Sequence, residues 1–126
     1  MKTSQDPRHQ HRIDQMQKLF SLSFRNDTQE KEIEPIVSQL TAIDQAIVES
    51  APEWPIDKIA KIDLAILRLA IYELIIESKQ PPKVIIDEAV ELAKSFGNSN
   101  SPSFINGALG TVLKKRNITA SSVTTE

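Results

Sequence analysis

Apolar side chains recur every three or four residues along most of this 126-residue chain, which is the spacing of helices with one buried face. Near the N-terminus the pattern is carried by Ile13, Met16, Phe20 and Phe24. Because the segments are short and closely joined, we expect an all-α fold, a compact orthogonal bundle of about six helices. The predicted helical segments are 7–24, 27–47, 55–61, 63–78, 83–96 and 101–116.

Capping residues and prolines mark the ends of several predicted segments. Asp6 precedes Pro7, and an aspartate can accept the free N–H groups of a helix whose first residue is proline. Asp27 and Glu30 have the spacing of a capping box at the start of the second segment. The sequence KQPP at 79–82 ends the fourth segment, because the residue before a proline avoids helical angles.

Five further positions carry expectations about local structure. Pro35 either lies in the first turns of the second segment or splits it. Trp54 stands between two prolines and is expected to cover the core at that turn. Gly97 predicts a left-handed cap at the end of the fifth segment. Gly107 and Gly110, in the last segment, would let a neighbouring helix approach closely.

The stretch AILRLAIYEL, residues 65–74, is apolar almost all round, yet it holds Arg68, Tyr72 and Glu73. Arg68 and Tyr72 are four residues apart and therefore share a helix face, where they can stack. The residues alone leave two alternatives open. Arg68 and Glu73 either form ion pairs with other helices or belong to a face that binds a partner.

The composition is that of a single globular domain, with 40% apolar and 25% charged residues. We expect one helical domain over residues 1–116 and a disordered tail over 117–126, since the tail is polar and lacks periodicity. The polar N-terminus predicts no signal peptide, and no segment reaches the roughly 18 apolar residues of a membrane span. The absence of cysteine suits the reducing cytoplasm.

Charge is unevenly distributed along the chain, although the net charge is only −2. Residues 1–25 carry five basic and two acidic side chains, whereas residues 26–126 carry ten basic and fifteen acidic ones. One interpretation is a contact with a polyanion at the basic end. The other is a first helix with a solvated charged face.

The sequence holds no convincing catalytic or metal site. His9 and His11 are two residues apart, so on a helix they point to different sides and suit a shared metal poorly. Three glycines leave no phosphate-binding loop. The acidic residues Asp87, Glu88 and Glu91 are expected to form a solvated face. We therefore expect no enzyme activity, no metal and no cofactor.

Three segments resemble the C-terminal half of the NusB transcription antitermination family. They read DLAILRLAIYEL at 63–74, VIIDEAVELAKSF at 84–96 and FINGAL at 104–109, in the order and spacing of the family. The N-terminal match is looser, because RHQHR stands where the family usually has a denser arginine cluster. The region between the first helix and Trp54 is also short for the family.

The resemblance implies an all-α fold of two small helical subdomains and a non-enzymatic, RNA-binding transcription antitermination factor. Members of the family pair with the small-subunit ribosomal protein also called NusE. The pair binds the boxA element of ribosomal RNA operons as single-stranded RNA, within the RNA polymerase antitermination complex. Some relatives form homodimers.

With this resemblance the candidate residues divide into two groups. Basic side chains would contact phosphates, and an aromatic ring would stack on an unpaired base. Glu73 would be an exposed carboxylate facing a basic partner, and Arg68 would form a structural ion pair. Tyr72 would either flank Glu73 at the partner surface or stay in the core. The RNA-binding candidates are Arg8, Arg12 and Phe20, with His9, Lys2 and Lys115 as additions.

Two alternative functions are left open. A NusB-like scaffold that binds protein but has lost or weakened RNA recognition would fit the thinned arginine cluster. A related helical domain also precedes RNA cytosine methyltransferases, although these 126 residues hold no catalytic domain of that kind.

Overall fold

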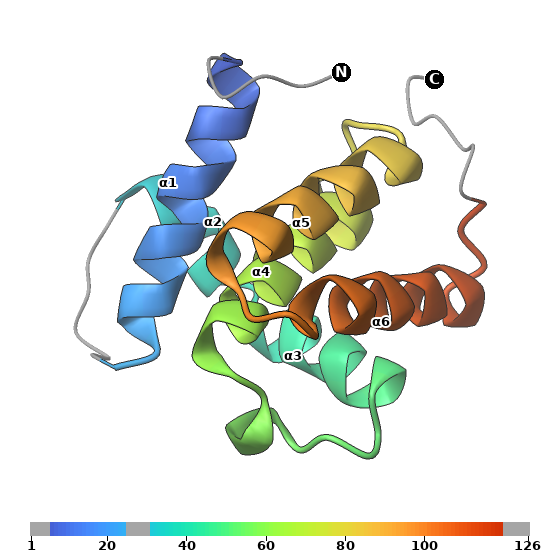
Figure 1. The fold of residues 1–126 in the computed structure, drawn as a ribbon. Helices are drawn as coiled ribbons and strands as arrows, with labels where there is room; N and C mark the ends of the chain where they lie inside the picture. Colours follow the sequence, from blue (N-terminus) through green and yellow to red (C-terminus); the bar gives the residue numbers. More distant parts are fainter. Residues whose placement is uncertain (1–5, 25–30, 120–126) are drawn as a thin grey trace.

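The computed structural model describes residues 6–24 and 31–119. Short 3-10 turns occur at Lys31–Ile33 and Ile56–Lys58, and a π-helical turn, Tyr72–Glu77, follows α4 directly. The described residues contain no strand, so the expected all-α bundle is confirmed. Within residues 6–24 and 31–119 there are six α-helices: α1 (Pro7–Leu22), α2 (Glu34–Val37), α3 (Leu40–Ser50), α4 (Lys61–Ile71), α5 (Pro82–Phe96) and α6 (Ser101–Lys115) (Figure 1).

The fold is organised around α4, which contacts α1, α3, α5 and α6. Figure 1 shows α1 on one side of the bundle and the end of α6 on the opposite side. One continuous apolar core includes Met16 of α1, Ile43 of α3, Leu67 of α4 and Leu109 of α6. No helix in the part of the chain described is long and apolar enough to cross a membrane.

The first helix begins where the sequence predicts, because Asp6 Oδ1 accepts a hydrogen bond of 2.9 Å from the backbone N–H of Arg8. The predicted capping box at 27–30 lies outside the described residues. The second predicted segment divides into α2, a single turn, and α3. The break falls after Pro35, where the Ser38 hydroxyl donates a hydrogen bond to the Pro35 carbonyl.

Gly97 is the C-terminal cap of α5, as predicted, but the predicted left-handed conformation and the close helix contact predicted at Gly107 and Gly110 are wrong. Gly97 has φ −93° and ψ −167°, so it adopts an extended rather than a left-handed conformation. A Cβ at Gly97 would lie 2.4 Å from the Ser101 hydroxyl oxygen, and this close approach excludes any larger residue without a shift. Gly107 and Gly110 face open space instead of a neighbouring helix.

Candidate nucleic-acid and partner interfaces

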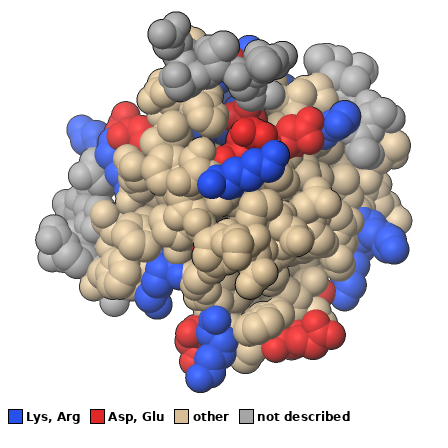
Figure 2. Space-filling model, in the orientation of Figure 1, with Lys and Arg blue, Asp and Glu red and all other residues tan. Residues whose placement is uncertain are grey.

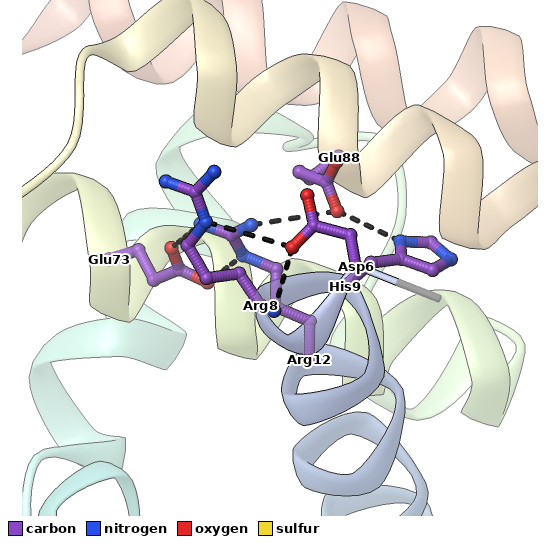
Figure 3. A network of polar contacts seen from close by, with 6 residues as sticks. All are labelled: Asp6, Arg8, His9, Arg12, Glu73 and Glu88. Carbon is purple, nitrogen blue, oxygen red and sulfur yellow. Dashed lines mark hydrogen bonds and ion pairs between the residues drawn. The ribbon is translucent and has the colours of Figure 1, made fainter. Parts of the chain in front are cut away.

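The first turn of α1 presents a basic surface. The Arg8 side chain is 73% exposed, and its Nε lies 3.7 Å from Asp6 Oδ1 (Figure 3). His11, on the next turn, is also exposed. Their exposure agrees with the expectation, common to both interpretations of the basic end, that its cationic side chains are accessible.

Arg12 contradicts that expectation, because it is only 8% exposed. Its Nε and Nη2 donate hydrogen bonds of 2.9 and 2.7 Å to the two carboxylate oxygens of Glu73, and its Nη1 lies 3.5 Å from Glu88 Oε1 (Figure 3). The helical spacing explains the burial: Arg12 is four residues before Met16 and seven before Leu19, so it continues the buried stripe of α1. A bidentate pair of this kind is held firmly in the folded protein.

His9 joins the same network. Its Nδ1 lies 3.0 Å from Glu88 Oε1, which links the first turn of α1 to the middle of α5. The sequence predicted that Glu88 belongs to a solvated acidic face. That prediction is wrong for Glu88, which is buried. We call these residues, His9, Arg12, Glu73 and Glu88, the ionic cluster. Among the described residues, no group of three His, Cys, Asp or Glu side chains could hold a metal ion.

The expectation that Glu73 is an exposed carboxylate is wrong, since it is buried and paired with Arg12. The ion-pair alternative is the correct one for Arg68 as well. Its Nε and Nη2 donate to the two carboxylate oxygens of Asp44 at 3.0 and 2.9 Å, which ties α4 to α3. Two of the three polar side chains in AILRLAIYEL, Arg68 and Glu73, therefore form ion pairs that connect helices within the fold.

Tyr72, the third, lies half-buried at the end of α4 and packs against the core. Burial raises the pKa of its hydroxyl above the usual 10.0, and the nearby carboxylates of Glu77 and Glu73 raise it further. The hydroxyl is therefore neutral at physiological pH and available as a hydrogen-bond donor.

A cavity of about 320 Å³ opens between the start of α1 and the π-helical turn. Its floor includes the Arg12–Glu73 pair, and Tyr72 forms part of its wall. We call this space the α1 cavity. The side chains around it come from α1 and from the end of α4 with the loop that follows: Arg8, His11 and Gln15 on one side, and Glu77, Lys79 and Gln80 on the other.

A second pocket, of about 390 Å³, lies where the turn before α4 meets the start of α6. Trp54 is 51% exposed, so it does not cover the core as predicted. Its ring meets that of Phe104 edge to face, with centroids 6.4 Å apart. Lys58 and Asn100 complete the rim, and we call this the Trp54 pocket.

Asp63 lines the Trp54 pocket from the first turn of α4 and was missed by the sequence reasoning. It is only 7% exposed, and its Oδ1 has no hydrogen-bond partner among the described residues. An unsatisfied buried carboxylate oxygen is costly and calls for an explanation. A signal was present in the sequence, because an aspartate interrupts the apolar run Ile62 to Leu67.

The remaining candidates are scattered. Phe20 packs against the core and meets Phe24 edge to face at 5.0 Å, about 18 Å along α1 from Arg8 at the usual helical rise. Lys115 donates a hydrogen bond to the Glu49 carbonyl at the end of α6, on the opposite side of the molecule from α1 (Figure 1). Lys2 lies outside the described residues.

Figure 2 shows a face of the molecule on which basic and acidic side chains lie side by side around the margin. The broad area between them carries few charged residues of either sign. This face, which includes α5 and α6, offers no continuous basic surface for a polyanion.

We compared the chain with protein families, curated proteins and solved structures. The NusB family model matches residues 27–114. The transcription antitermination proteins NusB of Chloroflexus aggregans and of a Roseiflexus species are 49% and 51% identical to the chain over 75 residues, which are 58% of it. These aligned residues span about half the length of the relatives, 50% and 53%.

The structure of T. maritima NusB superposes with a TM-score of 0.79 at 33% identity, and the match covers 91% of this chain and 94% of that one. Since the family model covers more than half of the chain and the fold agrees almost throughout, the sequence and the structure lead to the same assignment. The chain belongs to the NusB family.

Proposed function

We propose that the chain is a non-enzymatic transcription antitermination factor that binds boxA-type RNA of ribosomal RNA operons together with a NusE-type ribosomal protein. The observation that carries the proposal is the basic rim of the α1 cavity, on a protein whose relatives are antitermination proteins. RNA and protein partner would occupy different surfaces, and each surface has chemistry suited to its ligand.

The RNA would bind at the start of α1. Arg8 and His11 are exposed there, and Lys79 reaches the same rim from the loop after α4. Cations drawn from two separate segments can follow the phosphates of a single strand. Arg12 is paired with Glu73, and in this proposal it holds the turn in place instead of contacting RNA directly.

The protein partner would bind at the Trp54 pocket rather than at Glu73. Asp63 lines the pocket with a carboxylate that forms no ion pair among the described residues, and the Trp54 and Phe104 rings stand beside it. A lysine or arginine side chain from a basic ribosomal protein would pair with the carboxylate and lie against an aromatic face. The buried carboxylate would then be satisfied only in the complex.

The two surfaces would act together. With a net charge of −2 and few cations at the rim, the chain alone is expected to bind RNA weakly. A basic partner that contacts the same RNA makes the second contact intramolecular, which raises the overall affinity without any new interaction at α1.

Fluorescence anisotropy with labelled RNA tests the proposal. A boxA-type strand and a scrambled strand are titrated with the chain, with and without the NusE-type protein, at two salt concentrations. We expect preference for boxA in the presence of the partner, with weakening at higher salt. Arg8→Ala and Lys79→Ala should reduce the affinity, whereas Lys94→Ala, which removes an exposed cation of α5 paired with Glu91, should not.

One observation supports the alternative function, a scaffold that binds protein but has lost or weakened RNA recognition. Arg12 is engaged in the ionic cluster, which leaves fewer arginines for RNA than the sequence suggests. A stable complex with the partner that shows no preference between boxA and scrambled RNA would establish the scaffold and exclude the antitermination factor proposed above.

A further inference from the structure

The shape of the α1 cavity depends on an irregularity at the end of α4. The chain passes there from an α-helix into a π-helical turn, and the backbone N–H of Ser78 donates to the carbonyl of Glu73, five residues earlier, at 2.9 Å. The wider turn brings Tyr72 and Glu77 to the same wall of the cavity. In a regular α-helix, two residues five positions apart would point in different directions. Such turns occur frequently at functional sites.

The chemistry around the cavity is arranged in two layers. The cations Arg8 and Lys79 stand at the rim on opposite sides, and both side chains are exposed. Further in, Tyr72 offers an aromatic ring and a hydroxyl, and the amides of Gln15 and Gln80 supply hydrogen-bond donors and acceptors.

The charges around the cavity give this arrangement a direction. The floor offers a phosphate no free cation, because Arg12 is paired with Glu73, and the carboxylate of Glu77 would also repel it. A phosphate is therefore directed to the cations at the rim, and the flat, uncharged part of a nucleotide is directed inward. At about 320 Å³ the cavity is at the small end of the range for ligand sites, so it suits one base and not a base pair.

We propose that the α1 cavity receives a single unpaired nucleobase of the bound RNA, stacked on Tyr72, with the adjoining phosphates at Arg8 and Lys79. The inference rests on the proposed RNA-binding function and adds to it a site for one particular nucleotide. It also explains why a few cations would suffice, because base stacking contributes affinity that does not depend on charge.

The experiment is a scan of the RNA against variants of the cavity, in the presence of the NusE-type protein. A series of boxA-type strands is made in which each nucleotide in turn lacks its base. Against the unaltered protein, we expect one position whose abasic form binds about tenfold more weakly, as is typical for the loss of one stacked base. Replacement of that base by 2-aminopurine should give fluorescence that is quenched on binding.

Variants then assign that position to the cavity. Tyr72→Leu should weaken intact RNA by a similar factor and leave the abasic strand unaffected, so that the two changes are not additive. Because Tyr72 also packs against the core, Gln80→Ala provides a second test at a loop residue and should reduce the penalty of the abasic strand. Asn106→Ala, at an exposed position of α6, is the matched control.

The outcomes separate this inference from the function on which it rests. If intact boxA RNA binds preferentially but every abasic strand binds alike, the cavity holds no base and the inference is overturned while the function stands. Additive effects of Tyr72→Leu and the abasic change would also overturn it, because the base would then bind elsewhere. If boxA RNA is not preferred at all, the proposed function fails first and the inference fails with it.

Discussion

The ionic cluster and the Trp54 pocket both contain buried carboxylates, but the carboxylates differ in whether they have a partner inside the fold. In the ionic cluster, Glu73 accepts two hydrogen bonds from Arg12. In the Trp54 pocket, Asp63 Oδ1 has no partner among the described residues, and exposed aromatic rings lie beside it. The carboxylates of the first region are paired with Arg12 and His9 inside the folded chain, whereas Asp63 forms no ion pair among the described residues.

This difference teaches how to separate structural from functional charges in a small helical protein. Burial alone does not distinguish them, since Glu73 and Asp63 are exposed to a similar small extent. The partner decides: a buried charge that is paired within the fold supports that fold, and a buried charge left unpaired is a candidate for binding. Variants of the two regions should therefore change different measurements.

The largest effect is expected from Arg12→Ala. It leaves Glu73 buried without its partner, so the free energy of unfolding should fall by about 3–5 kcal/mol. Urea denaturation followed by circular dichroism measures the change. Arg8→Ala, one helical turn earlier and exposed, should change it by no more than about 0.5 kcal/mol. A loss below about 1 kcal/mol for Arg12→Ala would show that the cluster is not structural.

The second effect concerns the Trp54 pocket. Asp63→Asn should weaken binding of the NusE-type protein by about 2 kcal/mol or more, because the partner's cation would lose its carboxylate. Stability should fall by no more than about 1 kcal/mol, the contribution of a carboxylate in the first turn of a helix, since no hydrogen bond to Oδ1 is lost among the described residues. Titration calorimetry measures the affinity, and Asp87→Asn on the exposed face of α5 is the control. Unchanged affinity would exclude Asp63 from the partner surface.

A smaller effect is expected from the aromatic wall of the same pocket. Trp54→Phe keeps an aromatic ring but reduces the area that a cation can cover, so partner affinity should fall by about 0.5–1 kcal/mol. Trp54 is the one tryptophan in the chain, and its fluorescence in the unaltered protein should shift when the partner binds. A tryptophan spectrum that does not respond to saturating partner would place the interface elsewhere.

The smallest effect is a pH dependence at Tyr72. Since burial and the carboxylates of Glu77 and Glu73 raise its pKa in the folded protein, the folded chain holds the phenolic proton more tightly than the unfolded chain does. The resulting stability is fully present below about pH 10 and is lost as the pH rises through the folded pKa.

Tyr72 is the one tyrosine in the chain, so absorbance of the tyrosinate at alkaline pH reports this residue alone. Its midpoint should lie above 10.0 in the folded protein and fall in Glu77→Gln, which removes one cause of the shift. A midpoint at or below 10.0 would contradict the burial of the hydroxyl.

The helices follow from interactions between near neighbours in the chain. Asp6 caps the helix that Pro7 begins, prolines at 81 and 82 separate α4 and its π-helical extension from α5, and apolar spacing marks the buried faces. The family resemblance also came from the local segments at 63–74, 84–96 and 104–109. The helix ends and the buried faces depend on backbone angles and helical periodicity, which a few adjacent residues determine.

Assignments that failed depended on contacts between distant residues. Arg12 and Glu73 are 61 residues apart, and only the packing of α1 against α4 brings the two buried side chains together. In the same way, the exposed position of Trp54 beside Asp63 is set by how the turn before α4 meets α6. Gly97 differs from these cases, because the Ser101 side chain that crowds it is only four residues away, and its extended backbone angles do not themselves require glycine.

Local sequence therefore accounts for the all-α class and most helix boundaries, because those rest on periodicity, caps and prolines, and the family was indicated by the resemblance of three motifs. Tertiary packing decided which of the charged residues are structural and which surround a cavity. The sequence does not show which residue pairs with a given charged side chain. Whether it lies buried and paired, as Glu73 does, or buried and unpaired, as Asp63 Oδ1 is, depends on the helix that packs against it.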